Sequence, residues 1–310
     1  MGKYTIRGSG KLDAKIDSDL RRISEAASPH ARAGVLLGGY GRGEGTPFVN
    51  PDGLQSPFND YDLVVVVDRL DGAVRQKFQS LEKQLTTELG LPVDLCPYLH
   101  SHLRKCEFSM LNYEMKHGHK VVWGGDGILG SMPAYPHDAI PLAEGTRLLL
   151  NRGKLLLDIQ QRLALPEPLN DEERIRFIKF INKAWLAFGD CALLVERKYD
   201  ILYAIKKERI PTIGSCPGSD AVVAGYLQAV ELKEWGNFQP LEDFDIAAGY
   251  ETVRELFVHF LPWYRMQVPA FRHTAPSWIR ERLCTALLEL LQGQPGMPPK
   301  LFYKLQRRFS

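Results

Sequence analysis

The chain has 310 residues, of which 45% are hydrophobic and 25% charged, a balance typical of folded globular proteins and not of disordered ones. Thirty-nine Lys and Arg residues against 37 Asp and Glu residues leave a formal net charge of +2. This charge excludes a strong general attraction to nucleic acid or anionic membranes. Because the start lacks an apolar leader and the longest aliphatic runs are only strand-length, we expect a cytoplasmic protein.

Up to about residue 140, short β-type runs alternate with helical patterns. The elements expected from these patterns, in chain order, are a helix over 17–27, a buried strand over 33–38, a strand covered on both faces over 61–67, a helix over 71–89, and strands over 92–98 and 120–123. This mixture predicts a sheet domain of the α/β or α+β class.

From residue 141 onward the strand signal disappears. Patterns of helical length cover 142–163, 171–199, 219–235, 243–264 and 277–291, and a short helix is expected in the basic tail after residue 295. Proline-containing breaks separate several of these segments. The sequence therefore predicts two domains, a sheet domain over 1–140 and an all-helical domain over 141–310.

The first predicted strand runs into a glycine-rich turn, GGYGRGEG, at 38–45. So many glycines indicate positive φ angles or a close approach of some group to the backbone, and a helix beginning there would favour a phosphate. A Walker A loop is excluded, because Glu44 stands where that motif needs Lys. The Rossmann spacing also fails, since Glu44 or Thr46 occupies the third glycine position. Taken alone, the turn could equally be a flexible surface loop.

Three aspartates accompany the turn. Asp60 and Asp62 open the strand at 61–67, and residues two apart on a strand point to the same side. Two such charges repel each other unless a divalent cation lies between them. If the strand that carries Asp94 is its neighbour, three carboxylates converge at one end of the sheet, the ligand set of a two-metal phosphoryl or nucleotidyl transfer centre. The alternative is that Asp60 caps a strand and Asp94 is a solvated turn acid.

Taken in order, Gly38–Glu44, Asp60–Leu63 and Val93–Leu95 resemble the signature of the DNA polymerase β-type nucleotidyltransferase superfamily. The glycine run is most similar to that of the bacterial PII uridylyltransferases. The resemblance extends over roughly residues 33–98. It implies an α+β fold, in which a small mixed β-sheet catalytic domain flanked by helices is followed by an all-helical C-terminal domain that closes the cleft.

The resemblance also implies roles for individual residues. Asp60 and Asp62 would bind two Mg²⁺ ions, with Mn²⁺ as a substitute, and Asp94 would bind the ion that activates the acceptor. The residues that it places at an NTP, such as ATP, are Gly38, Gly39, Gly41, Arg42 and Glu44. Gly38 and Gly39 would approach the triphosphate. Arg42 would contact phosphate, or Arg42 and Glu44 would pair with each other.

The sequence departs from the superfamily between Gly39 and Asp60, where the segment is longer than usual. The surplus residues 45–58 are rich in proline and glycine, and we expect them to form a hairpin or flap over the site. This departure bears on the identity of the substrate and not on the acids.

The segment 171–199 is apolar almost all round, apart from one narrow stripe. The stripe contains Glu172, Arg176, Lys179, Lys183, Asp190 and Arg197. One interpretation is that it is the solvated face of a core helix. The other is that it lines the interdomain cleft, where Lys183 with Lys179 would hold the triphosphate, as a helical-domain lysine does in several members of the superfamily.

These observations predict a Mg²⁺-dependent nucleotidyltransferase that moves an NMP from an NTP to an acceptor hydroxyl or phosphate and releases pyrophosphate. The near-neutral charge favours a small molecule or a protein side chain as acceptor over nucleic acid, and no membrane partner is expected. Two alternatives remain open: a tRNA- or RNA-end nucleotidyltransferase of a toxin type, and a non-catalytic nucleotide-binding regulatory protein.

Overall fold

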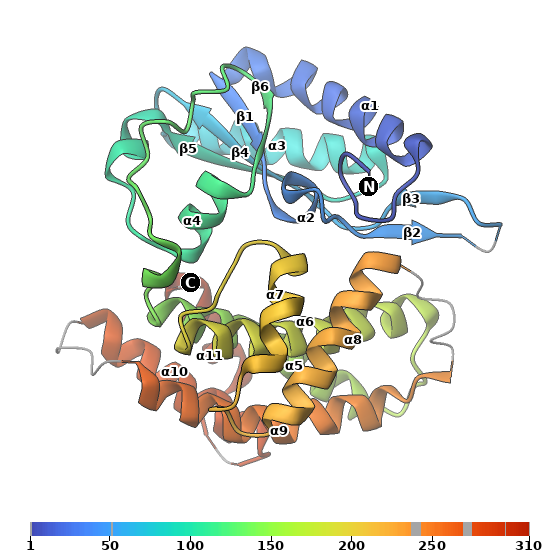
Figure 1. Cartoon of the computed structure of the whole chain (residues 1–310), viewed down its shortest axis with the longest axis vertical. Helices are drawn as coiled ribbons and strands as arrows, with labels where there is room; N and C mark the ends of the chain where they lie inside the picture. The colour runs from blue at the N-terminus through green and yellow to red at the C-terminus, as the bar shows by residue number, and fades with distance from the viewer. Residues whose placement is uncertain (1, 51, 237–242, 269–274, 295, 310) are drawn as a thin grey trace. The chain divides into compact units, whose positions relative to one another are not determined.

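The computed structural model describes residues 2–50, 52–236, 243–268, 275–294 and 296–309 (Figure 1). The fold is α+β, with 62% helix and a small mixed sheet of four strands. The chain forms two compact units. The first contains Met1–Ile140, Asp200–Ile205 and Glu231–Gln239, and the second contains Pro141–Tyr199, Lys206–Val230 and Pro240–Ser310. Two short segments of the expected helical domain thus belong to the sheet unit.

The sheet of the first unit has the strand order β5-β4-β1-β6. Its strands are β1 (Ala33–Leu36), β4 (Tyr61–Val67), β5 (Val93–Leu99) and β6 (Lys120–Trp123). β4 and β5 are parallel, whereas β1 is antiparallel to both β4 and β6, which makes the sheet mixed. All four strands were predicted from the sequence, and β4 is an interior strand, as its continuous apolar pattern indicates.

Helices α1 (Gly10–Ala27) and α3 (Gly72–Leu89) pack on one face of this sheet (Figure 1). The core between them takes alternate residues of β4, beginning with Tyr61 and Leu63. α1 begins seven residues earlier than predicted. Its N-cap Ser9 accepts a hydrogen bond from the amide of Leu12, and Leu12 is fully buried, so the first turns are fixed by capping and packing.

The predicted insertion contains a β-hairpin. Strands β2 (Pro47–Val49) and β3 (Gln55–Pro57) pair antiparallel as a separate two-stranded sheet, which confirms the hairpin expected over 45–58.

The other elements of the first unit are the 3-10 segment η1 (Ser28–His30), α2 (Gly38–Arg42), η2 (His100–Lys105), α4 (Met110–His117) and η3 (His137–Ala139). α4 was not predicted.

Past residue 140 the described elements are all helical. They are α5 (Ala143–Leu163), α6 (Asp171–Val195), α7 (Tyr203–Arg209), η4 (Ile210–Thr212), α8 (Ser219–Trp235), α9 (Ile246–Gln267), α10 (Ala275–Leu291) and α11 (Pro299–Phe309). α7 was not predicted, and α6 ends four residues before the expected position. Of the helices that the structure describes, none is both long and apolar enough to pass through a bilayer.

A buried ionic cluster in the second unit corrects one expectation for α6. Asp190, assigned to the polar stripe, is buried and forms an ion pair of 2.9 Å with Lys206, whose side chain is only 2% exposed. The Tyr226 hydroxyl donates to the same carboxylate at 3.0 Å, and the Lys206 ammonium lies 4.8 Å from the centre of the Tyr199 ring. Asp190 therefore belongs to the core and not to a continuous polar face.

Candidate functional site

Three carboxylates converge at one end of the sheet in the first unit. The parallel register of β4 and β5 places Asp62 directly opposite Asp94, and Asp60 immediately precedes β4. One carboxylate oxygen from each of the three residues lies within 4.8 Å of the other two. The expected convergence is confirmed. Asp60 and Asp62 point away from the face on which Tyr61 is buried, as strand alternation requires.

The electrostatics of the cluster suit a divalent cation. Partial burial, and then the negative charge of Asp60, raise the pKa of the Asp94 carboxyl above its ordinary value. A cation bound among the three acids would relieve this repulsion. Carboxylate oxygens are the ligands that Mg²⁺ and Mn²⁺ prefer, so the donor set fits the metal that the sequence suggests.

The glycine turn lies directly against Asp62. The Leu37 amide donates to the Asp62 carbonyl at 2.8 Å, and α2 starts at the next residue, Gly38. Gly38 has a φ of +62°, and a Cβ there would lie 2.7 Å from a carboxylate oxygen of Asp62. Both the left-handed backbone and the contact require glycine. The turn is therefore a fixed neighbour of the acids, and not a flexible surface loop.

Gly39 and Gly41, the other two glycines that the sequence analysis assigned to the nucleotide, have different neighbours. A Cβ on Gly41 would lie 2.4 Å from the Leu36 carbonyl oxygen, so glycine at this position serves backbone packing. A Cβ on Gly39 would lie 3.1 Å from the ammonium nitrogen of Lys233. The surroundings of Gly39 thus include a cation, and so do those of Gly41, whose carbonyl accepts a hydrogen bond from the Lys120 ammonium at 3.2 Å.

Lys233 is one residue of this region that the sequence analysis missed. It lies near the end of α8, in a segment of the first unit, and its side chain is half-buried. The ammonium donates to the Thr46 hydroxyl at 3.4 Å and lies 5.5 Å from the centre of the Tyr203 ring. No local pattern marks this lysine, because only the tertiary fold brings it to the glycine turn.

Arg42 and Glu44 are engaged within the protein. The Arg42 guanidinium lies 3.7 Å from Glu44 and 3.2 Å from Glu114, and Arg42 and Glu44 are both buried. Glu44 also accepts hydrogen bonds from the backbone amides of Tyr203 at 3.1 Å and Ala204 at 3.3 Å. Of the two expected roles, mutual pairing is therefore the one that the structure shows. Glu44 holds the first residues of α7 in the first unit.

Two tyrosines fix the chain on either side of Asp60. The hydroxyl of Tyr40 accepts a hydrogen bond from the Phe58 amide at 2.9 Å and donates to the Thr46 carbonyl at 3.1 Å. The hydroxyl of Tyr61 donates to the buried carboxylate of Asp19 at 2.9 Å. Tyr40, which the sequence analysis left without a role inside the glycine turn, is therefore a positioning residue for the start of β4.

We expect Tyr40→Phe to lower the free energy of unfolding by about 1–3 kcal/mol, because the amide and the carbonyl that it engages would be left buried without a partner. Urea denaturation measures this change. Tyr250→Phe is a suitable control, since the buried Tyr250 hydroxyl has no hydrogen-bond partner in the part of the chain that the structure describes, and its loss should cost almost nothing. Equal effects of the two substitutions would contradict the positioning role.

Lys183 and Lys179 lie on α6, which belongs to the second unit. Lys183 is exposed, and Lys179 is partly buried. A contact of either lysine with a triphosphate stays a prediction.

Comparisons of the chain with protein-family models, with curated proteins and with solved structures return no significant match. Inferences about function therefore come from the residues of the site and from the resemblance of its motifs.

Proposed function

We propose that the protein is a metal-dependent nucleotidyltransferase that transfers an NMP from an NTP to an acceptor hydroxyl or phosphate. The observation that carries this proposal is the convergence of Asp60, Asp62 and Asp94 at the end of two parallel strands, with Gly38 in contact with Asp62. The order of these motifs in the chain, which resembles the polymerase β-type superfamily, adds support.

Each part of the site has a role in this proposal. Asp60 and Asp62 would hold two Mg²⁺ ions, and Asp94 would hold the one nearer the acceptor. Bound there, the ions would supply Lewis-acid activation of the acceptor oxygen and charge neutralisation of the leaving pyrophosphate. The Asp94 carboxylate would also help to accept the acceptor's proton.

The phosphates of the donor would lie along the glycine turn. A side chain at Gly38 would enter the space beside the Asp62 carboxylate, so glycine keeps the backbone close to whatever binds the acids. Lys233, beside Gly39, would help to neutralise the triphosphate. The acceptor oxygen would attack the α-phosphorus as the bond to the β-phosphate breaks, and the acceptor would lose one proton.

The acceptor favoured by the chain's charge is a small molecule or a protein side chain. A formal net charge of +2 over 310 residues gives little of the phosphate attraction on which binding of long nucleic acids depends. Binding to RNA that weakens steeply with salt would favour the RNA-end alternative instead.

The test is a screen of the purified protein with each of the four NTPs and Mg²⁺ or Mn²⁺. One NTP should raise the Tm by roughly 5–10 °C at a concentration of a hundred times its Kd. Addition of cell extract as a source of acceptor should then release pyrophosphate. Asp60→Asn/Asp62→Asn should abolish both responses, because it removes the charge that holds the metal.

Asp126→Asn is the matched control, since Asp126 is an exposed aspartate of the same unit outside the cluster. A metal-dependent shift that survives the double substitution would place the nucleotide elsewhere. The absence of any shift with either metal would reject the transferase proposal.

A further inference from the structure

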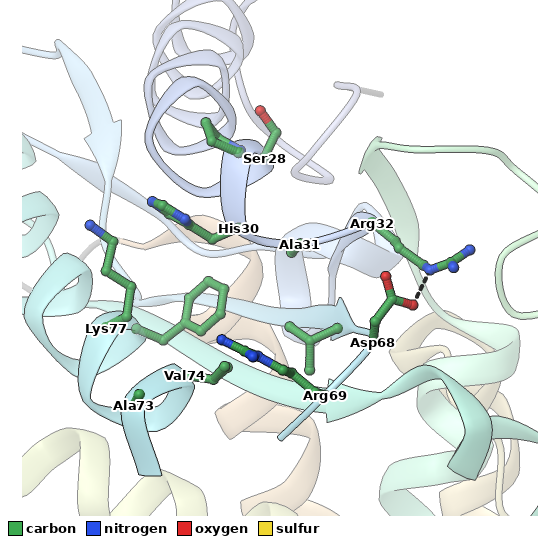
Figure 2. A pocket seen from close by; sticks show the side chains of 12 residues that line it. Ser28, His30, Ala31, Arg32, Asp68, Arg69, Ala73, Val74 and Lys77 are labelled. Carbon is green, nitrogen blue, oxygen red and sulfur yellow. Dashed lines mark hydrogen bonds and ion pairs between the residues drawn. The ribbon is translucent and has the colours of Figure 1, made fainter. Parts of the chain in front are cut away.

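A second candidate site lies at the other end of β4. A cavity of about 810 Å³ is formed by residues 28–32 after α1, residues 67–69 at the end of β4, and the first turns of α3 (Figure 2). Asp60 and Asp62 stand at the amino end of β4, whereas this cavity adjoins its carboxyl end. A strand of this length spans about 20 Å, so the two sites are separate.

The cavity combines an apolar wall with charged groups. Val67 and Phe78 are buried, and Val74 is partly buried beside them. The charged and titratable side chains that line it are His30, Arg32, Asp68, Arg69 and Lys77. Three permanent cations therefore face one lining acid, which leaves the cavity electropositive.

The cations are of two kinds. Arg32 pairs with Asp68, and Arg69 lies 3.5 Å from Asp71, just outside the lining. All four of these side chains are largely exposed, and such ion pairs contribute little to stability. The two arginines can therefore exchange their carboxylate partners for a bound anion. Lys77 has no ion pair among the described residues. In Figure 2, Lys77 and His30 lie at one end of the cavity, and the Arg32–Asp68 pair lies at the other.

We propose that this cavity binds a small organic phosphate, that is, a phosphomonoester with an apolar or aromatic body. Lys77 and Arg69 would bind the doubly charged phosphate group, for which Arg and Lys are the preferred side chains, whereas Arg32 lies at the other end of the cavity. Val67, Val74 and Phe78 would contact the body of the ligand. The volume is in the range of small-molecule sites, and the ligand needs neither a metal nor the aspartate cluster.

The probe is phenyl phosphate, titrated calorimetrically into the full-length protein at low salt with EDTA present. We expect saturable binding of phenyl phosphate. Inorganic phosphate should bind more weakly because it lacks the aromatic ring, and phenol should bind more weakly because it lacks the phosphate group. Lys77→Glu should weaken the binding of phenyl phosphate by at least about tenfold, since it replaces attraction with repulsion. Lys83→Glu, an exposed position on the same helix outside the cavity, should leave the affinity unchanged.

Three results would overturn the proposal. The first is no binding of phenyl phosphate, and the second is equal weakening of its binding by Lys77→Glu and Lys83→Glu. The third is a loss of binding in Asp60→Asn/Asp62→Asn while the Lys77→Glu variant binds as tightly as the unaltered protein. The last would locate the ligand at the aspartate cluster. Because EDTA removes divalent cations, failure of this experiment leaves the proposed nucleotidyl transfer untouched, and the reverse also holds.

Discussion

Gly38→Ala should weaken Mn²⁺ binding by about 10–100-fold, the usual cost of disturbing a group that orients a metal ligand. The added Cβ would lie 2.7 Å from the Asp62 carboxylate, so the carboxylate must rotate out of the cluster. The substitution should also lower the free energy of unfolding by about 1–2 kcal/mol, because alanine is strained at a φ of +62°. Titration with Mn²⁺, followed by calorimetry, measures the affinity.

Gly90→Ala separates the two effects. Gly90 ends α3 with a φ of +67°, and a Cβ there meets nothing within 4 Å. This control should lose a similar amount of stability and retain the Mn²⁺ affinity of the unaltered protein. If the two alanine variants bound Mn²⁺ equally well, contact between the glycine turn and Asp62 would have no part in metal binding.

Lys206→Met should lower the free energy of unfolding by about 3–5 kcal/mol, since it leaves the charge of Asp190 buried without its partner. The Tyr226 hydroxyl would still donate to Asp190, but one neutral donor does not replace an ammonium. Lys206→Met/Asp190→Asn should recover part of the loss, because the unpaired charge is then removed. Urea denaturation of the three proteins measures these changes.

Arg22→Met is the control for an ordinary ion pair. Arg22 binds Glu88 on the surface of the first unit, where both side chains are more than a third exposed, and its loss should cost less than about 1 kcal/mol. Should Lys206→Met cost no more than Arg22→Met, the Asp190 carboxylate would have to be solvated or protonated in the variant.

The parts of the fold that local patterns specify were predicted well. β4 and α3 have strong periodicity with clear boundaries, and the observed elements agree with the prediction within a residue. α7 was missed because seven residues carry little periodicity, and Glu44, distant in sequence, accepts its first amide hydrogen bonds. The end of α6 was placed at residue 199, four residues too late, because the helical pattern continues past Arg197, whose φ of 57° is incompatible with helix.

The residues of the candidate site also divide into those that local patterns predict and those that they do not. The three aspartates and the glycine turn were identified because their spacing along strands and turns is itself the signal. The pairing of Arg42 with Glu114 and the position of Lys233 depend on contacts between residues far apart in the chain. Asp190 was assigned to a polar face because helical periodicity cannot tell a solvated acid from one that a buried lysine neutralises.

The first unit is built from three stretches of chain, and this affects how it folds during synthesis on the ribosome. Asp60, Asp62 and Asp94 are synthesised well before Lys233, by an interval on the order of ten seconds at roughly 5–20 residues per second. Until residues 200–205 emerge, the Glu44 carboxylate lacks the amides of Tyr203 and Ala204 that it binds in the finished protein. A nascent chain that stops at Ile140 therefore carries the acidic cluster but not Lys233, and the sheet unit is complete only after much of the helical sequence has been made.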